Sequence, residues 1–367
     1  MKNKPNKYRF LFAGGGTGGH LFPAVAVAEK IKALKPEAEI LFVGTKSKIE
    51  GTVVPKLGYK FKTIWIKGFA RKFDIQNILF PLKVIVSFLQ SLFINASFKP
   101  RVAIGSGGYV SGPAIWGASV LGAKVILLEQ NSYPGITTRL LEKKAEQVHI
   151  SFEDTKKYLK DSSKIFLTGN PVRESLKLVD KSEALKKFNF NPDKKTLLIL
   201  GGSLGAASIN SAVAANIKLF IENDIQVIWQ TGKNYFENYK DLKDPLVWIN
   251  PFIDEMSSAF SAADLLISRA GATTIAEVTT LGIPTVFVPS PNVAANHQYY
   301  NAKSLSDQDA AILLADNQVK NELGKIVLDT ISDKNKLDLL LQNVKKAGKP
   351  DAALKIAQSA IKLAETL

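Results

Sequence analysis

The sequence predicts an α/β protein made of two similar domains, each built around a parallel sheet. Short runs rich in β-branched and aromatic residues alternate with longer helical patterns, as in residues 8–13, 21–34 and 39–44, and this alternation is typical of βαβ units. The order strand, glycine-rich loop, helix occurs twice, at residues 9–31 and 195–217. The chain of 367 residues also exceeds one ordinary core, since a domain usually has about 100–200 residues.

The domain boundary is expected at the motif TGNPVRESL, residues 168–176, because its Asn-Pro pair favours an extended turn. The N-terminal domain would then cover residues 1–172 and the C-terminal domain residues 173–345. The last segment, residues 346–367, has a helical, alanine-rich pattern and is expected to pack back on the N-terminal domain. Ligands of open α/β sheets bind beyond the carboxyl ends of the strands, so loops from both domains are expected to face one cleft.

Composition excludes several classes of protein. A hydrophobic content of 46% with 22% charged residues is that of a soluble globular chain. The absence of cysteine excludes disulfides and thiolate catalysis and is compatible with a reducing compartment. The basic, polar start is unlike a signal peptide, so we expect a location inside the cell. The net charge of +15 favours anionic partners, namely nucleic acid, phosphorylated small molecules or an anionic membrane face.

The first glycine loop formally matches a dinucleotide-binding fingerprint, because Gly14, Gly16 and Gly19 satisfy G-x-G-x-x-G. That function also requires an acidic residue at the end of the second strand to hold a ribose. The second expected strand, in residues 39–48, ends instead in Gly-Thr-Lys. A dehydrogenase is therefore disfavoured.

The glycine loops are better suited to phosphate. Glycines let backbone N–H groups approach an anion, and the helix that follows directs its positive end at the same place. A tight turn without a ligand would explain any one such loop. Four segments rich in small residues, however, follow apolar runs and precede helices, and together they favour one large site for a phosphorylated sugar; they are residues 14–19, 105–113, 201–206 and 268–277.

Three side chains near these loops are candidates for sugar chemistry. His20 stands where the first loop becomes a helix, and a neutral imidazole there can act as a general base, with a structural cap as the alternative. Glu277 is expected on the first turns of a helix, after the residues Gly-Ala-Thr-Thr at 271–274, and could accept ribose hydroxyls or simply be solvated. The segment NHQYYNA, residues 296–302, offers amides to sugar hydroxyls, although such residues are also common in surface loops.

Residues 60–101 combine charge with hydrophobicity, since they contain eight Lys or Arg residues and one acid, Asp74. The apolar part, residues 78–94, has one charge, Lys83, and is too short and too polar to be expected to span a membrane. After Val84 we expect a buried helix. Before it, apolar side chains beside Arg71, Lys72 and Lys83 are expected to form a membrane patch, of which the main members are Phe69, Phe73, Ile75, Leu79 and Phe80.

Eight segments of the chain, taken in order, carry a family resemblance: GGGTGGHLFPAVAVA, GGYVSGP, EQNSYPG, GNPVR, GGSLGA, FIDEM, SRAGATTIAE and NHQYYNAK. In sequence and spacing the chain resembles the MurG family of transferases, which add N-acetylglucosamine (GlcNAc) to lipid I to make lipid II for peptidoglycan. The resemblance implies the GT-B architecture, two Rossmann-like domains facing across a cleft. It also implies an inverting transfer from UDP-GlcNAc to the C4 hydroxyl of the acceptor's MurNAc unit, with a base but no covalent intermediate.

The resemblance assigns donor-site roles residue by residue. Arg173 and Ser203 would bind phosphate, Ile253 would meet uracil through its backbone, Glu277 would hold the ribose and Gln298 the sugar hydroxyls. The remaining donor-site positions that it implies are Thr17, Gly18, Gly19, Asn131, Arg269, Ala272, Thr273 and Thr274.

On the acceptor side, the motifs imply a second set of residues, with His20 as the catalytic base. Leu128 stands where many family members have a histidine, which leaves His20 as the clearer candidate for the base. The expected acceptor-side residues are Gly107, Gly108, Tyr109, Ser111 and Glu129.

Two rival functions remain to be weighed. Another GT-B enzyme, such as a glycolipid synthase or a UDP-GlcNAc epimerase, could share the donor loops, but the segments GGYVSGP and EQNSYPG argue against both. A basic nucleic-acid-binding protein would fit the charge, yet the sequence contains no known nucleic-acid module. The expected partners are UDP-GlcNAc, lipid I and an anionic membrane surface. Other cell-wall enzymes are compatible with the sequence as further partners, and nucleic acid is not expected to bind. We expect a peripheral protein on the inner face of the cytoplasmic membrane, with no cofactor and no metal, since no clear D-x-D motif is present.

Overall fold

The computed structural model describes residues 7–68 and 79–366, and the chain divides into two units. One unit comprises Met1–Arg173 together with Lys349–Leu367, and the other comprises Glu174–Gly348. Each unit contains one sheet in which all neighbouring strands are parallel. The chain therefore crosses between the units twice, once after Arg173 and once before Lys349.

The first unit has a seven-stranded sheet in the order β3-β2-β1-β4-β5-β6-β7. Its interior strand β1 (Arg9–Ala13) shows the alternation that buries both faces: Phe10 and Phe12 belong to one core, Leu11 and Ala13 to the other. The strands are β1 (Arg9–Ala13), β2 (Glu39–Gly44), β3 (Lys60–Thr63), β4 (Val102–Gly105), β5 (Lys124–Glu129), β6 (Gln147–Ile150) and β7 (Ile165–Leu167).

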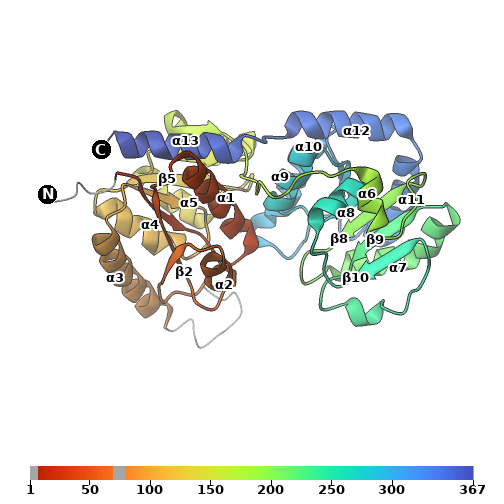
Figure 1. Ribbon diagram of the computed structural model, residues 1–367, viewed down its shortest axis with the longest axis horizontal. Helices are drawn as coiled ribbons and strands as arrows, with labels where there is room; N and C mark the ends of the chain where they lie inside the picture. Colours follow the sequence, from red (N-terminus) through yellow and green to blue (C-terminus); the bar gives the residue numbers. More distant parts are fainter. Residues whose placement is uncertain (1–6, 69–78, 367) are drawn as a thin grey trace. The chain divides into compact units, whose positions relative to one another are not determined.

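Helices cover both faces of this sheet (Figure 1). The helices α1 (Gly18–Leu34) and α13 (Ala352–Glu365) lie side by side over one core, with α2 (Ile49–Lys56) beside them. The helices α4 (Ser111–Val120) and α5 (Ile136–Leu141) serve the other core, followed by the 3-10 turns η2 (Glu142–Lys144), η3 (Glu153–Tyr158) and η4 (Ser162–Lys164). Ile356, Ala357 and Ala360 of the C-terminal helix are fully buried in the first of these cores.

The helix α3 (Phe80–Phe98) forms an outer layer on α4 and buries its polar side. Four polar residues at four-residue spacing face inward: Lys83, Ser87, Ser91 and Asn95. The large apolar side chains point outward, with Leu82 49%, Ile85 58%, Leu89 62% and Phe93 77% exposed. The prediction of a buried apolar helix after Val84 is therefore wrong.

Hydrogen bonds and small side chains explain this inverted packing. The hydroxyl of Ser91 donates to the Ser87 carbonyl (2.6 Å), and the Asn95 amide donates to the carbonyl of Ala114 on α4 (3.2 Å). At Gly117 of α4 an added Cβ would lie 3.2 Å from Ser91 Cβ, so the two helices approach closely through small residues. Lys83, expected among the exposed cations of the membrane patch, is instead buried, with its Nζ atom 5.7 Å from the ring centroid of Trp65.

In the part of the chain that the structure describes, α3 alone is long and apolar enough to cross a membrane. It has 19 residues and a mean hydropathy of 1.3, whereas the sequence expectation stopped at residue 94. Only 22% of its apolar window is buried. Of the expected membrane patch, Leu79 is 46% exposed and Phe80 is partly buried, while Phe69, Phe73 and Ile75 lie outside the described residues.

The second unit has a six-stranded sheet in the order β10-β9-β8-β11-β12-β13. Buried side chains of α7 and α11 pack with Leu197, Ile199 and Ile267 on one face, and α8 and α9 belong to the other (Figure 1). The strands are β8 (Thr196–Leu200), β9 (Gln226–Gln230), β10 (Val247–Asn250), β11 (Leu265–Ser268), β12 (Thr285–Phe287) and β13 (Ile312–Leu313). The helices are α6 (Lys181–Lys186), α7 (Ala207–Glu222), α8 (Met256–Ala262), α9 (Ala272–Leu281), α10 (His297–Ser306), α11 (Val319–Ile331) and α12 (Lys334–Ala347), with the 3-10 turns η5 (Phe236–Asn238) and η6 (Ala294–Asn296).

Candidate active site

In the first unit, the candidate residues gather at the carboxyl ends of the neighbouring strands β1, β4 and β5. The helix α1 leaves β1 over one core, and α4 leaves β4 over the other. Between two such strands the chain diverges, and this is the point at which open α/β sheets bind ligands. His20 lies in the first turn of α1, and Gly107 and Gly108 lie in the loop after β4.

The loop after β1 is shaped to present backbone N–H groups. Gly16 has a φ of +84°, which other residues rarely adopt. Thr17 is the exposed N-cap of α1, and Gly18 and Gly19 form the first turn. The His20 N–H donates to the Thr17 carbonyl (3.3 Å), whereas the N–H groups of the first residues of a helix, here Gly18 and Gly19, have no acceptor within it. The helix dipole makes this end positive. The loop can therefore bind an anion such as a phosphate.

A buried carboxylate that sequence reasoning missed anchors this loop. Glu50 of α2 is 1% exposed; its Oε2 accepts the Gly16 N–H (2.9 Å), and its Oε1 accepts the N–H (3.0 Å) and hydroxyl (2.7 Å) of Thr45. A Cβ added at Gly15 would lie 2.4 Å from Glu50 Cδ. The tight glycine sequence is thus required by a side chain 35 positions later, and no local motif marked that residue.

The imidazole of His20 is held by two oxygen atoms. Its Nδ1 lies 3.0 Å from the Ser106 carbonyl oxygen and 3.2 Å from Gln130 Oε1. Both partners are acceptors, so Nδ1 carries the hydrogen and Nε2 of the neutral ring has the free lone pair. This is the tautomer that a general base at Nε2 requires.

The orientation of Gln130 supports that tautomer. Its Nε2 donates to the carbonyls of Ser106 (3.0 Å) and Leu128 (3.2 Å), which leaves Oε1 facing His20. Gln130 is 2% exposed, so water does not compete for these bonds. Sequence reasoning used Gln130 only as part of a motif and assigned it no role. The side chain of Leu128 is itself buried in the core, 2% exposed.

The glycines after β4 are required by their closeness to His20. Gly107 and Gly108 have φ values of +96° and +78°. A Cβ at Gly107 would lie 2.7 Å from His20 Nδ1, and one at Gly108 would lie 2.5 Å from the Gly15 carbonyl oxygen. The segment expected on the acceptor side therefore also shapes the surroundings of His20.

Two other residues expected on the acceptor side differ in exposure: Tyr109 is partly buried and Ser111 is fully buried. Tyr109 packs its ring against Gly16, where an added Cβ would be 3.3 Å from Cε1, and burial raises the pKa of its phenol. Ser111 is 1% exposed, with its hydroxyl 2.6 Å from the Ala13 carbonyl oxygen and 2.7 Å from that of Gly107. Ser111 thus joins the loops after β1 and β4, and its hydroxyl does not face outward.

Glu129 likewise faces inward. It is 3% exposed; its Oε1 accepts the Asn131 N–H (3.1 Å), and its Oε2 accepts the Gly135 N–H (2.9 Å) and the Thr138 hydroxyl (2.6 Å). A carboxylate so fully used cannot also hold an acceptor sugar, so we assign it to shaping the loop that carries Asn131. Asn131 is also fixed through its carbonyl, which accepts the Thr155 hydroxyl (3.0 Å).

Arg173, expected to bind phosphate, lies in the first unit. Its guanidinium carbon is 4.6 Å from the ring centroid of Phe22, two residues after His20 on α1. This contact adds a positive charge beside the first turns of that helix.

In the second unit, the expected donor residues follow the carboxyl ends of β8, β10, β11 and β12. Ser203 is exposed in the loop after β8. The backbones of Gly205 and Gly232 are in close contact there, since a Cβ on Gly232 would lie 2.1 Å from the Gly205 nitrogen. The loops after β8 and β9 therefore form one surface.

The backbone of Ile253 is held by Gln230, a second residue that sequence reasoning missed. The Ile253 N–H donates to Gln230 Oε1 (2.9 Å), while Gln230 Nε2 donates to the Gly202 carbonyl (3.2 Å). With its N–H engaged, the carbonyl is the backbone group of Ile253 that can meet a base. The amide of Gln230 also connects this position to the loop containing Ser203.

The helix α9 begins immediately after the loop that follows β11. Ala272, Thr273 and Thr274 form its first turn, and Glu277 is partly buried in the second. The hydroxyl oxygen of Thr273 is buried and has no hydrogen-bond partner among the described residues. Buried polar atoms are normally paired, so this hydroxyl and the helix N-terminus together fit an anionic or hydroxylated ligand.

Arg269 differs from the expectation. Its guanidinium pairs with Asp316, donates to the Ser208 hydroxyl (2.8 Å) and donates to the Val288 carbonyl (3.1 Å). With 17% of the side chain exposed, we assign Arg269 to holding the loops together rather than to contacting donor. Gln298 of α10 accepts the Ser290 N–H through Oε1 (2.8 Å), which leaves its amide NH2 as the group able to contact a sugar.

Comparison with known proteins shows the family to which the chain belongs. Residues 10–150 match the glycosyltransferase family 28 N-terminal domain, and residues 196–360 match the glycosyltransferase family 28 C-terminal domain. Two relatives named UDP-N-acetylglucosamine–N-acetylmuramyl-(pentapeptide) pyrophosphoryl-undecaprenol N-acetylglucosamine transferase are similar over nearly their whole length. The protein of Flavobacterium psychrophilum is 43% identical over 98% of this chain and 99% of its own. That of Bacteroides thetaiotaomicron is 44% identical over 97% and 98%.

Solved structures agree in fold. MurG of Acinetobacter baumannii has a TM-score of 0.76 and 27% identity, covering 96% of this chain and 99% of that one. The S. aureus protein MnaA, solved with UDP, has a TM-score of 0.69 at 14% identity over 97% of both chains, a likeness that shows the fold alone. The two parallel sheets are thus those of the GT-B fold. The chain belongs to glycosyltransferase family 28 and, within it, to the MurG family of enzymes.

Proposed function

We propose that this enzyme transfers GlcNAc from UDP-GlcNAc to the C4 hydroxyl of the MurNAc unit of lipid I, the undecaprenyl-pyrophosphoryl acceptor, forming lipid II. The donor and acceptor are those in the names of its relatives. The observation that carries the proposal is the position of His20 at the first turn of α1, where its Nδ1 faces two acceptor oxygens and its Nε2 is left to act as a base. This arrangement provides a base where a hydroxyl must lose its proton.

The proposed step is a single displacement. The C4 hydroxyl gives its proton to His20 Nε2, and its oxygen forms a bond to the anomeric carbon. The bond from that carbon to the β-phosphate oxygen breaks, and its electron pair leaves with UDP. Attack from the face opposite the leaving group inverts the configuration, so an α-linked donor gives a β1→4 product.

The charge that develops on UDP requires stabilisation. We assign this to the N–H groups at the start of α9 and to the loop containing Ser203, with Arg173 as a further cation. The partnerless hydroxyl of Thr273 supports a ligand at the first of these places. Glu277 is assigned to the ribose and the amide NH2 of Gln298 to sugar hydroxyls.

The test is turnover with UDP-GlcNAc and a short-chain lipid I analogue, followed by NMR of the product. We expect a β1→4-linked disaccharide and no product with UDP-glucose at equal concentration. An α linkage would contradict the displacement. If the protein showed no turnover but retarded DNA in a gel-shift assay, the rival nucleic-acid function would be favoured.

We further propose peripheral binding to the inner face of the cytoplasmic membrane through the outer side of α3. Leu82, Ile85, Leu89 and Phe93 form one stripe along this helix and are 49–77% exposed. Lys99 follows at its C-terminal end and is exposed. An apolar stripe that ends at a cation suits the interface of an anionic leaflet, and an acceptor with a long lipid tail requires an enzyme at that surface.

The packing of α3 favours lying in the interface over spanning. One side of the helix carries Lys83, Ser87, Ser91 and Asn95 and is buried against the rest of its unit. A spanning helix would have to release that side into lipid, where each unpaired polar group is costly.

A further inference from the structure

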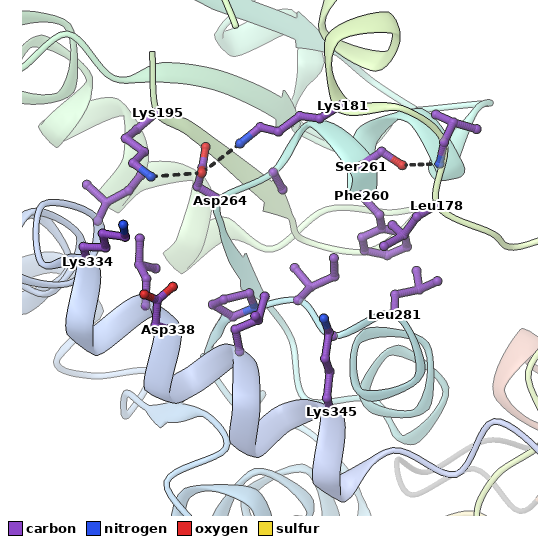
Figure 2. Close-up of a pocket in the computed structure, with 18 of the residues that line it drawn as sticks. Leu178, Lys181, Lys195, Phe260, Ser261, Asp264, Leu281, Lys334, Asp338 and Lys345 are labelled. Atoms are coloured by element: carbon purple, nitrogen blue, oxygen red, sulfur yellow. Dashed lines mark hydrogen bonds and ion pairs between the residues drawn. The ribbon is translucent and has the colours of Figure 1, made fainter. Parts of the chain in front are cut away.

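A pocket of about 500 Å³ lies in the second unit, at the amino-terminal ends of the strands, whereas the donor loops follow their carboxyl ends. Figure 2 shows the side chains that line it. It is lined by residues that precede β8, β11 and β12, such as Lys195, Asp264 and Pro284, and by side chains of α12. The donor loops follow the other ends of the same strands. Since β8 has 5 residues and a strand rises about 3.3 Å per residue, about 15 Å separates the two edges. The pocket is therefore distinct from the site assigned to UDP-GlcNAc.

The inner wall of this pocket is apolar. Phe260, Ile283 and Leu337 are almost fully buried there. Figure 2 shows Leu178 beside Phe260, with Leu281 on the same side of the pocket. Leu178 is 47% exposed, so apolar surface also remains open to solvent. An apolar group of a ligand would remove this surface from water.

The charges of the pocket are mostly positive. Four lysines line it, against two acids, Asp264 and Asp338; the lysines are Lys181, Lys195, Lys334 and Lys345. Asp264 Oδ1 is shared by Lys181 Nζ (2.8 Å) and Lys195 Nζ (3.3 Å), and its Oδ2 accepts the Thr196 N–H (2.9 Å). One carboxylate between two ammonium groups leaves an uncompensated positive charge, so the lining attracts anions.

We propose that this pocket binds a small, free anionic amphiphile: a phosphate or carboxylate that faces the lysines, joined to an aliphatic group that covers the wall of Phe260. The combination of an apolar wall with several charged groups around it is that of a ligand site, and its volume falls within the range for small molecules, about 300–1,000 Å³. The positive balance excludes a cationic ligand, and the apolar wall gives an alkylated anion the advantage over an inorganic one.

The pocket also borders both segments by which the chain passes between its units. Val179, five residues after the boundary residue Glu174, lines it and donates its N–H to the Ser261 hydroxyl (2.9 Å). Lys345 lies three residues before the other boundary residue, Gly348. A bound amphiphile would contact both segments and reduce their freedom.

Isothermal titration of the full chain with n-octyl phosphate, below its critical micelle concentration, tests the proposal. We expect one bound molecule per chain, at least tenfold weaker binding of inorganic phosphate, and no binding of the neutral octyl glucoside. If octyl glucoside bound with the same affinity as octyl phosphate, the lysines would play no part in binding. If inorganic phosphate bound with the same affinity, the apolar wall would play none. Either result, or no heat with octyl phosphate, would overturn the proposal.

Two sets of variants place the ligand. K334E together with K345E should weaken octyl phosphate at least tenfold. The control, K218E with K325E, makes the same change of charge at exposed lysines of the same unit on α7 and α11 and should leave affinity unchanged. S332W, at an exposed position of the lining, should block the pocket without touching a lysine. Equal loss in both charge pairs would mean attraction by overall charge only and would contradict the site.

Saturating UDP-GlcNAc separates this proposal from the proposed function. Octyl phosphate should still bind with one-to-one stoichiometry, because the donor loops lie at the opposite ends of the strands. Displacement by UDP-GlcNAc would place the amphiphile in the donor site and overturn the inference. Hydrogen exchange should slow at residues 174–181 when octyl phosphate binds, and unchanged exchange there would exclude the effect on that segment.

Discussion

Gln130 Oε1 lies 3.2 Å from His20 Nδ1, and the two side chains share the Ser106 carbonyl as a second partner. This triangle determines which ring nitrogen of the histidine carries hydrogen. A base at Nε2 needs the other nitrogen protonated, so Gln130 acts as a positioning residue for the proposed transfer.

The tautomer can be observed directly. In ¹⁵N NMR of the neutral His20 ring, we expect Nδ1 to show the shift of a protonated nitrogen and Nε2 that of a bare one. In Q130L the Nδ1 atom loses one of its two acceptors, so a mixture of tautomers should appear. The kcat should then fall about tenfold, the cost of one hydrogen bond of roughly 1.4 kcal/mol. The KM for UDP-GlcNAc should stay constant. A larger change in KM than in kcat would assign Gln130 to donor binding instead.

Glu50 is predicted to stabilise the fold through its bonds to Gly16 and Thr45. In E50Q an NH2 group replaces one oxygen, and either the Gly16 N–H or the Thr45 N–H loses its acceptor. A buried unpaired donor costs about 1–3 kcal/mol, which urea unfolding would measure. The control E153Q, at an exposed glutamate paired with Lys156, should change stability by less than about 0.5 kcal/mol. Equal effects of the two would refute the anchoring role.

Substitutions of Glu277 and Arg269 should have different effects, the first on donor KM and the second on stability. E277A is expected to raise the KM for UDP-GlcNAc with little change in kcat, because ribose contacts are made in both ground and transition states. R269M removes the guanidinium from Asp316 and the loop carbonyls, so it should lower the melting temperature first. If R269M kept wild-type stability and lost only donor affinity, Arg269 would return to the donor site.

His149 predicts acid sensitivity of folding. Burial in β6 lowers the pKa of its imidazole from 6.5 to about 4. Between these values the unfolded chain binds a proton that the folded chain does not, so stability is complete above about pH 6.5 and falls as the pH drops towards 4. The loss is on the order of 3 kcal/mol. In H149F, whose ring can keep the stacking on Phe166, unfolding free energy should depend less on pH; an unchanged slope would exclude His149 as the cause.

Membrane docking should depend on the outer side of α3. L89S with F93S should stay in the supernatant when anionic vesicles are sedimented, whereas wild type should pellet with them and much less with zwitterionic ones. L242S with L339S removes exposed leucines from the second unit and is the matched control. All proteins should still bind UDP-GlcNAc. If the α3 variant pelleted like wild type, another surface would have to carry the docking.

The sequence predicted the features that depend on residues close together in the chain. The strand–loop–helix repeats gave two parallel sheets, and the motif order identified the family that the comparisons show. Local patterns could not reveal Glu50, Gln130 or Gln230, because each contacts groups that are far away in the sequence: Glu50 and Gln230 bind backbone groups of other loops, and Gln130 faces the His20 ring. The helix α3 was misjudged for a related reason: its apolar residues suggested burial, but the small polar residues facing α4 decided its orientation. Glu129 and Arg269 were assigned to ligands by motif, whereas their partners lie within the protein.

The most direct test of the central claim compares kcat with donor binding in H20A. Because a general base acts in the transition state and typically contributes 10²–10⁴-fold, kcat with the lipid I analogue should fall by at least about 100-fold. The Kd for UDP-GlcNAc, measured by titration, should stay within about threefold of wild type, because the proposed role of His20 does not include a contact with the bound donor. A variant that kept near wild-type kcat would show that His20 is a structural cap and would contradict the account.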